Sequence, residues 1–433
     1  MRKKPIVIIG LGHVGLTLAL TFAEEGFSVT GVDTSPEILK SLQNRESPFF
    51  EPGLKELLQK NLDKNFQFFE SIPDLEASAY ILCVGTPVTS QDKSPDMEAA
   101  RKALQQIALK MKNESLVILR STVPVGTSRE IFLPILQTSQ KKFYYACCPE
   151  RVCEGNALKE LRALPQIIGG LDAPSLEKAS ALFETITPTR VAVSSLEAAE
   201  TVKLLDNCWR NTAFAFSNEV GLFCESLGLD ACQIIEWANL GYKRNCIPKP
   251  GFVGGPCLSK DTYLLTQPAG RKKASLPFIE TARHIHQQLP DHVCNRLKSF
   301  FDQNGKEIQK CKIFLSGLAF KGTPATDDMR GSPGLDVLFS LRKNGARILC
   351  GHDFACSPET ITKLDIPAVS MEEGFQNADA VLFLNNHENY SKLDLQPLLE
   401  RMNKPAFFFD AWHLFATKNR CAIPGISYGG IGF

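Results

Sequence analysis

One cysteine of this chain lies in a turn whose neighbours could make it a nucleophile. Residues 254–261 read GGPCLSKD, which places Lys260 and Asp261 three and four residues after Cys257. A cysteine attacks carbon when nearby cations, helix N-terminal amides or a general base favour its thiolate. Glycines let the backbone and a substrate approach the sulfur closely. The segment therefore indicates covalent catalysis at Cys257, and the structural alternative is a small buried thiol.

A glycine-rich turn near the N-terminus indicates a second chemical function. The β-branched run at residues 5–9 predicts a buried strand, and GLGHVG follows it at residues 10–15. Residues 16–25 predict a helix, and residues 27–33 predict a second strand that ends in Asp33. This order of strand, glycine turn, helix, strand and acid is typical of a dinucleotide-binding βαβ unit.

Each part of this unit has a physical task. Gly10 makes the tight turn, Gly12 lets the pyrophosphate approach the backbone, and Gly15 permits close packing of helix and strand. The start of the helix offers amides and a positive dipole to the phosphates. Asp33 would accept hydrogen bonds from ribose hydroxyls and repel a 2′-phosphate, which favours NAD over NADP. A hydride acceptor and a nucleophilic thiol together indicate oxidation of an aldehyde, or of an alcohol through an aldehyde.

Two further strands place polar side chains near these groups. Residues 79–84 and 116–119 predict strands, and the loops after them carry Thr86 and Thr122. Open α/β sheets bind ligands at the carboxyl ends of their strands, so both loops should face the cofactor or the substrate. The structural alternative for Thr122 is a threonine that caps a helix or turn.

Two pairs of polar residues are spaced four apart. Glu150 and Glu154 follow a predicted strand, whereas Lys203 and Asn207 lie in residues 194–227, which predict one long helix or two. Residues four apart share one face of a helix. Asn207 could donate to an oxygen and Lys203 could stabilise developing negative charge. Solvated surface is the alternative for both pairs.

A second α/β segment begins near residue 301. It carries strand candidates at residues 346–350 and 380–384 but lacks the glycine fingerprint. We therefore expect it to bind a different phosphate-bearing ligand. Lys321 and Arg330 suit such a ligand through their charge and, for arginine, its bidentate geometry.

Length, charge and cysteine usage exclude several classes of protein. A chain of 433 residues should form two or three domains. A net charge of +1 argues against a nucleic-acid partner. The 14 cysteines are scattered, without the spacing of a zinc site or a disulfide framework, so no metal is expected and a reducing cytoplasm is favoured. No segment is long and apolar enough for a membrane helix, so no membrane association is expected.

These motifs together resemble the nucleotide-sugar 6-dehydrogenase family, which includes the UDP-glucose and UDP-N-acetylmannosamine dehydrogenases. The resemblance covers nearly the whole chain in order. It rests on GLGHVGL at 10–16, VGTP at 84–87, STVPVGT at 121–127, PERVCEG at 149–155, the Lys203/Asn207 helix, GGPCLSKD at 254–261 and GLAFKGTPATDDMRGSP at 317–333.

The resemblance implies an α/β fold of two Rossmann-like, doubly wound domains bridged by a long central helix that usually forms a dimer core. Residues 1–195 would bind NAD, residues 196–300 would form a central helical region with Cys257, and residues 301–433 would bind the UDP-sugar. A homodimer or a higher homo-oligomer is expected. The product would be a uronic acid precursor of surface polysaccharide.

The same resemblance implies two successive oxidations of the sugar C6 alcohol to a carboxylate, with two NAD per turnover. Cys257 would attack the C6 aldehyde, and the resulting thiohemiacetal would be oxidised to a thioester that water hydrolyses. Lys203 and Asn207 would stabilise the oxyanion, and Asp261 with Thr122 would position or activate water. Glu150 or Glu154 would serve as general base.

The resemblance also implies the binding residues. Arg244 in this family can reach the neighbouring subunit's site. Cofactor contacts are expected from Gly10, Gly12, His13, Val14, Gly15, Asp33, Thr86 and Thr122, and substrate contacts from Glu154, Lys203, Asn207, Arg244, Gly254, Lys260, Lys321 and Arg330.

The sequence leaves the sugar open between UDP-glucose and a UDP-N-acetylhexosamine. Residues 149–170 look like the N-acetylhexosamine enzymes, whereas Glu154 and Lys260 look like the UDP-glucose enzymes. Trp412 stands where the UDP-glucose enzymes often have arginine. The alternatives to this family are a β-hydroxyacid dehydrogenase, which would need neither Cys257 nor a third domain, and a non-catalytic NAD-binding regulator.

Overall fold

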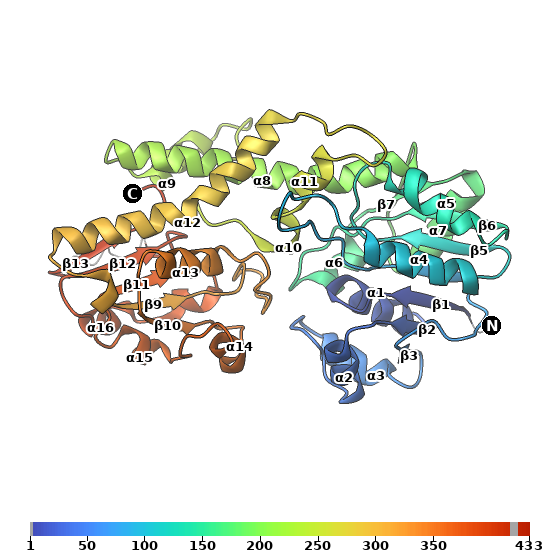
Figure 1. The fold of residues 1–433 in the computed structure, drawn as a ribbon, viewed down its shortest axis with the longest axis horizontal. Helices are drawn as coiled ribbons and strands as arrows, with labels where there is room; N and C mark the ends of the chain where they lie inside the picture. The colour runs from blue at the N-terminus through green and yellow to red at the C-terminus, as the bar shows by residue number, and fades with distance from the viewer. Residues whose placement is uncertain (1–2, 416–422) are drawn as a thin grey trace. The chain divides into compact units, whose positions relative to one another are not determined.

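The computed structural model describes residues 3–415 and 423–433, and it shows a mixed α/β fold with two separate sheets. The predicted fold class, two Rossmann-like sheets and a long central helix, is confirmed (Figure 1). Within those described ranges, none of the helices combines the length and apolar character needed to cross a bilayer.

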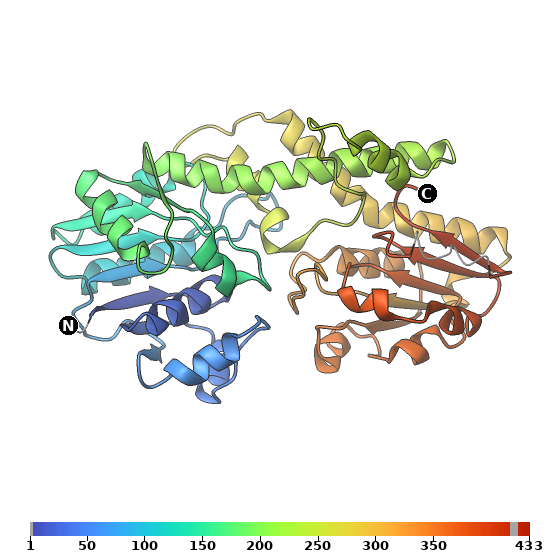
Figure 2. The ribbon, with the colours of Figure 1, turned by 180° about the vertical axis from the view of Figure 1, so that it is seen from behind.

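The chain forms two compact units, each assembled from two stretches of sequence. Unit 1 comprises Met1–Asn207 with Lys260–Leu276, and unit 2 comprises Cys208–Ser259 with Pro277–Phe433. The helix α8 (Leu196–Ser226) gives its first residues to unit 1 and its remainder to unit 2. It is the long green helix in Figures 1 and 2.

The sheet of unit 1 has eight strands in the order β3-β2-β1-β4-β5-β6-β7-β8. Neighbouring strands are parallel except for β6 and β7. The order reverses between β1 and β4, and open α/β sheets bind ligands at such a switch point. The strands are β1 (Lys3–Ile9), β2 (Phe27–Val32), β3 (Phe66–Phe69), β4 (Ala79–Leu82), β5 (Ser115–Leu119), β6 (Phe143–Cys147), β7 (Gln166–Gly170) and β8 (Arg190–Val193).

Helices cover both faces of this sheet, which explains the unbroken apolar run of β1. Ile6 and Ile8 lie in a core with α1, α3 and α7, whereas Val7 and Ile9 lie in a core with α4 and α5. Side chains alternate across a strand, so a strand buried on both faces is apolar throughout. The helices of this unit are α1 (His13–Glu24), α2 (Pro36–Gln43), α3 (Leu54–Asn61), α4 (Glu98–Lys110), the π-helical turn η1 (Ser128–Phe132), α5 (Leu133–Gln137), α6 (Ala157–Ala163), α7 (Ala173–Phe183) and α11 (Asp261–Thr266).

The sheet of unit 2 has five parallel strands in the order β10-β9-β11-β12-β13. Its helices α12 and α13 pack on one face, and α15 and α16 pack on the other. The elements are α9 (Ala231–Asn239), α10 (Gly255–Leu258), α12 (Pro277–Gln303), η2 (Ile308–Lys310), β9 (Lys312–Ser316), α13 (Pro333–Lys343), β10 (Ile348–His352), α14 (Pro358–Thr362), α15 (Met371–Phe375), β11 (Ala380–Phe383), η3 (Glu388–Lys392), α16 (Leu395–Glu400), β12 (Ala406–Asp410) and β13 (Ile426–Gly429).

The two units share the same type of turn after their first strand. Gly10 and Gly317 follow β1 and β9 with φ angles of +90° and +97°, a conformation that favours glycine. In unit 1 the next amide, that of Leu11, donates to Asp33 at 2.6 Å. In unit 2 the amide of Leu318 donates to Asp353 at 2.7 Å. The units differ afterwards, because α1 begins three residues after its glycine whereas α13 begins only at Pro333.

A buried histidine joins α12 to the part of α8 that lies in unit 2. His286 Nε2 lies 2.8 Å from the carbonyl oxygen of Asn211, so Nε2 carries the hydrogen and donates it. Its Nδ1 then accepts from the amide of Asn218 at 3.3 Å, and Asn218 also bonds both backbone groups of Gly251. Burial lowers the pKa of His286 to about 4.

We expect this histidine to make the protein less stable in mild acid. The folded state keeps His286 neutral, whereas the unfolded chain binds a proton at its ordinary pKa of about 6.5. The stabilisation is therefore complete above pH ~6.5, and up to about 3 kcal/mol is lost as the pH falls to ~4. Urea unfolding of His286→Gln should show a shallower loss between these pH values than the unaltered chain. The exposed His284→Gln on the same helix is the control, and equal pH dependence in all three proteins would contradict the prediction.

Candidate active site

The glycine turn of unit 1 leaves room for a cofactor at one position and none at its neighbours. A Cβ on Gly10 would lie 2.7 Å from the carbonyl oxygen of Cys83, and one on Gly15 would lie 1.7 Å from that of Gly10. A Cβ on Gly12 would meet nothing within 4 Å. Two glycines are therefore required by packing, and Gly12 faces open space at the start of α1.

These features fit a dinucleotide. The N-terminus of the 12-residue helix α1 offers amides and a positive dipole beside the open position, which suits a pyrophosphate. The carboxylate of Asp33 accepts from the amides of Leu11 and Ser35 at 2.6 and 2.8 Å. A carboxylate has about four acceptor sites, so Asp33 can also accept from ribose hydroxyls.

Hydrogen bonds join the loops after β4 and β5, as expected for loops that face one ligand. Thr86 Oγ1 donates to the carbonyl oxygen of Thr122 at 2.5 Å, and Ser121 Oγ donates to that of Val84 at 2.7 Å. Thr86 is buried and Thr122 is half-buried. The structure therefore brings these two predicted threonine segments together at the switch point of the sheet.

The two glutamates after β6 have different surroundings. Glu150 is buried, forms a 2.6 Å ion pair with the buried Arg120, and accepts from the amides of Arg151 and Val152. Glu154 is partly exposed and lies 4.0 Å from His13 Nε2, beside the glycine turn. The first carboxylate is occupied in holding its loop, and the second lies next to the expected cofactor position.

Two acids that the sequence did not single out hold loops of this unit. Glu51 accepts from the amides of Gly155 and Ala157 at 2.7 and 2.8 Å, and so supports the loop of Glu154. Glu200 accepts from the amides of Gly126 and Ser128. Their partners lie far away in sequence, and neither acid has a local pattern that marks it.

One face of α8 meets the segment that follows Cys257 in sequence. Asn207 Nδ2 donates to Asp261 Oδ2 at 2.6 Å, and Lys260 Nζ lies 2.9 Å from Asp261 Oδ1. Asp261 is 1% exposed, and Lys203, one turn earlier on the same face, is buried. Asn207, Asp261 and Lys260 therefore form one hydrogen-bonded cluster in unit 1.

The Cys257 turn in unit 2 is fixed by its glycines. The amide of Gly255 donates to the carbonyl oxygen of Gly331 at 2.8 Å. A Cβ on Gly254 would lie 2.4 Å from that same oxygen, and one on Gly255 would lie 2.6 Å from the ring of Phe320. Cys257 is exposed in the short helix α10. Cys257 is thus an exposed residue in a turn packed against the loop after β9.

The expected cationic contacts of unit 2 are exposed or half-buried. Arg330 is mostly exposed and its guanidinium is held by the buried Asp328 through bonds of 2.5 to 3.0 Å. Lys321 Nζ lies 5.4 Å from the ring centre of Phe320. Arg244 lies over Tyr242 and donates to its hydroxyl at 3.0 Å.

Trp412 fills space against the backbone of unit 2. A Cβ on Gly251 would lie 2.8 Å from the indole, and Phe214 packs edge-on against the same ring at 6.2 Å between centres. The indole is therefore a packing element here, which a flexible, charged arginine could not replace without leaving space beside Gly251.

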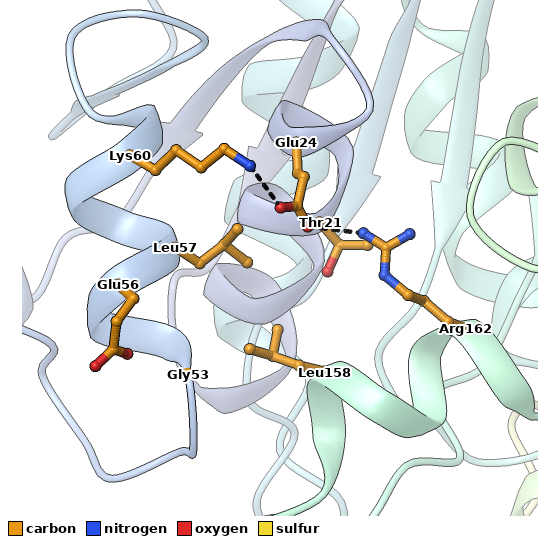
Figure 3. A pocket seen from close by; sticks show the side chains of 8 residues that line it. All are labelled: Thr21, Glu24, Gly53, Glu56, Leu57, Lys60, Leu158 and Arg162. Atoms are coloured by element: carbon orange, nitrogen blue, oxygen red, sulfur yellow. Dashed lines mark hydrogen bonds and ion pairs between the residues drawn. The ribbon is translucent and has the colours of Figure 1, made fainter.

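A separate hollow of about 290 Å³ lies on unit 1 between α1, α3 and α6 (Figure 3). Its rim carries Glu24, which pairs with Lys60 and Arg162 at 2.9 Å each. The hydrogen bond from Lys60 is the main cause that lowers the pKa of Glu24. None of the predicted site residues lines this hollow, and Glu24 ends α1, the far end from the glycine turn. We interpret this hollow as a structural feature of the surface, bordered by ion pairs that connect the three helices.

A glycine turn that fits NAD, at the switch point of a parallel sheet, defines an NAD-dependent oxidoreductase. The chain belongs to the UDP-glucose/GDP-mannose dehydrogenase family. The family's NAD binding domain matches residues 4–187, its central domain residues 197–288, and its UDP binding domain residues 314–417. The protein is therefore an NAD-dependent nucleotide-sugar dehydrogenase with a UDP-binding domain, and the predicted family and cofactor are confirmed.

Named relatives cover almost the entire chain. A UDP-N-acetyl-D-mannosamine dehydrogenase of Methanococcus maripaludis is 31% identical over 94% of this chain and 92% of its own length. The structure of a UDP-N-acetylmannosamine dehydrogenase from Pyrococcus horikoshii matches with a TM-score of 0.88 and 29% identity, over 99% of both chains. The structure of a UDP-glucose dehydrogenase from Pyrobaculum islandicum matches with a TM-score of 0.85 and 25% identity, over 99% of this chain and 98% of that one.

The glycine turn yields a matched pair of substitutions. Gly12→Ala places a methyl group where the structure has open space, so the protein should fold normally but lose NAD affinity, because the methyl group occupies the expected pyrophosphate position. Gly10→Ala should instead lower the melting temperature, since its φ is +90° and its Cβ meets the backbone of the loop after β4. Thermal unfolding and NAD titration separate the two effects. Full NAD affinity in Gly12→Ala would contradict this cofactor position.

Proposed function

We propose that this enzyme oxidises C6 of UDP-N-acetylmannosamine to a carboxylate in two steps, with two NAD per sugar. The observation that carries the proposal is the Asn207–Asp261 hydrogen bond. It joins the helix face of Lys203 to the segment that begins three residues after Cys257. The sugar is chosen because the relatives with about 30% identity are mostly named for it.

The thiol of Cys257 is proposed to retain the intermediate between the two oxidations. Its thiolate adds to the C6 aldehyde and forms a carbon–sulfur bond, which gives a thiohemiacetal. Loss of a hydride from that carbon and of the hydroxyl proton to the general base leaves a thioester, and water then displaces the thiol and releases the acid. NAD, when bound, supplies the hydride acceptor at both oxidations.

The clustered polar residues are proposed to handle charge and water in these steps. Lys203 and Asn207 stabilise the oxygen that gains negative charge when sulfur adds to carbon. Asp261 and Thr122 position or activate water. Of the two glutamates, Glu154 is the better general base, because Glu150 is already committed to Arg120 and two backbone amides.

The proposal also assigns a binding role to each region of the chain. Residues 1–195 bind NAD, residues 196–300 form the central region, and residues 301–433 bind the UDP moiety. Exposed cations suit a diphosphate. The proposed contacts are Glu154, Lys203, Asn207, Arg244, Gly254, Lys260, Lys321 and Arg330. Trp412 is proposed to replace the arginine of the UDP-glucose enzymes as a packing surface.

We further propose a homodimer formed through α8. Trp209, Phe216 and Phe223 are 71%, 53% and 62% exposed and are spaced by seven residues, so they form one apolar stripe along the helix. Such a stripe on a long helix is typical of an interface with a second helix.

A cytoplasmic location and a role in surface polysaccharide synthesis complete the proposal. The buried, free thiols of Cys147 and Cys148 agree with a reducing compartment.

The function is tested by NADH production with UDP-N-acetylmannosamine, UDP-N-acetylglucosamine, UDP-N-acetylgalactosamine and UDP-glucose in parallel. We expect two NADH per sugar from UDP-N-acetylmannosamine, because both oxidations occur before release. In Cys257→Ser we expect no net acid and retained NAD binding, since a serine hydroxyl is a far weaker nucleophile than a thiolate. Cys246→Ser alters another exposed cysteine and serves as the control.

Two outcomes would contradict parts of this proposal. A preference for another of the four sugars would overturn the substrate assignment and leave the chemistry standing. Unchanged acid production by Cys257→Ser would overturn the thioester route.

The dimer is tested by Phe216→Glu, which places a charge in the apolar stripe. We expect the molar mass measured by light scattering to fall from that of a dimer to that of a monomer, because a buried unpaired charge is costly at an interface. Leu109→Glu, on the exposed side of α4, is the control because Leu109 is 79% exposed and lies outside the stripe. A monomeric unaltered protein would refute the proposed interface.

A further inference from the structure

The buried carboxylate of Glu200 ties a loop of the candidate site to the helix that carries its catalytic residues. Glu200 lies on α8 and is 2% exposed. Its Oε2 accepts from the amide of Gly126 at 2.6 Å, and its Oε1 accepts from the amide of Ser128 at 2.8 Å. Both oxygens are thus engaged with the backbone between β5 and η1.

This backbone segment has few other ways to satisfy its amides. It leaves the carboxyl end of β5, turns at Gly126 with φ +93°, and enters η1 at Ser128. A helix start has N–H groups without helical partners, and an acidic side chain at that position satisfies them and interacts favourably with the dipole. Glu200 supplies this cap from α8, 72 residues away in sequence.

The spacing on α8 links the cap to the catalytic residues. Lys203 and Asn207 follow Glu200 by three and seven residues, so all three lie on one face of the helix. The loop that Glu200 holds also carries Thr122, six residues before Ser128. One rigid helix face therefore contacts the Thr122 loop at one end and Asp261 at the other.

We propose that Glu200 is a positioning residue that sets the distance between Thr122 and the Lys203–Asn207 pair by holding the Gly126 and Ser128 amides. This inference rests on the roles proposed above for those three residues. The residue does not touch the reacting atoms. Burial raises the pKa of Glu200 to about 7, while its hydrogen bonds with Ser128 and Gly126 act in the opposite direction.

The test compares Glu200→Gln with Glu197→Gln. The Glu200→Gln side chain would present an NH₂ group to one of the two amides, so one hydrogen bond is lost with the side-chain volume unchanged. Glu197 is also a glutamate and lies in the same turn of α8. Its carboxylate pairs with the side chain of Arg129 at 2.7 Å on the surface, whereas that of Glu200 accepts from backbone amides. We expect kcat to fall ~10–100-fold in Glu200→Gln with NAD affinity unchanged, and no such fall in Glu197→Gln.

A second readout does not depend on activity. Hydrogen exchange of the peptide that spans residues 121–132 should speed up in Glu200→Gln and stay unchanged in Glu197→Gln, because one of the Gly126 and Ser128 amides loses its acceptor. Unaltered kcat or unaltered exchange in Glu200→Gln would overturn the inference.

If Glu200→Gln does not fold, Glu200→Asp is measured in the same way. It keeps the charge but cannot reach both amides, so full kcat there would also overturn the inference. Lack of NADH from the unaltered enzyme with all four sugars would instead refute the proposed function, while the exchange result would still decide whether Glu200 holds the loop.

Discussion

Loops at the carboxyl ends of parallel strands have backbone amides that find no acceptor in a neighbouring strand, and in this protein buried or half-buried carboxylates accept from them. Asp33 holds the glycine turn after β1, Glu51 the loop after β6, and Glu200 the loop after β5. Asp353 does the same for the turn after β9 in unit 2. Because ligands bind at these strand ends, the placement of these four loops bears directly on the proposed sites.

Burying these carboxylates has an energetic cost that the hydrogen bonds offset only in part. An isolated buried carboxylate is strongly unfavourable, and bonds from two backbone amides stabilise its charged form. The balance is visible at Glu200, where burial outweighs its bonds and the pKa rises to about 7. At Glu150 a buried ion pair with Arg120 adds to two amide bonds. Each loop is consequently fixed by bonds that lose their strength if the side chain shifts.

The two sheets show that a glycine turn alone does not make a dinucleotide site. Gly10 and Gly317 have the same backbone conformation, and in each turn the amide of the next residue donates to an aspartate that follows the next strand. Only in unit 1 does a helix begin directly after the turn, at His13, with open space at Gly12. The anion site comes from the helix N-terminus, and a long loop that ends at Pro333 replaces it in unit 2, in agreement with the match to a UDP binding domain.

The sequence by itself determined the family, the α/β fold class and the NAD turn, because these depend on local patterns. Strand periodicity, glycine spacing and the acid at Asp33 are set by backbone geometry within about thirty residues. The strand order, the surroundings of Glu150 and Glu154, and the loop contacts of Glu51 and Glu200 were decided only in the tertiary structure. Their partners are separated by up to 106 residues, and whether a carboxylate is buried against distant amides depends on packing that no local spacing encodes.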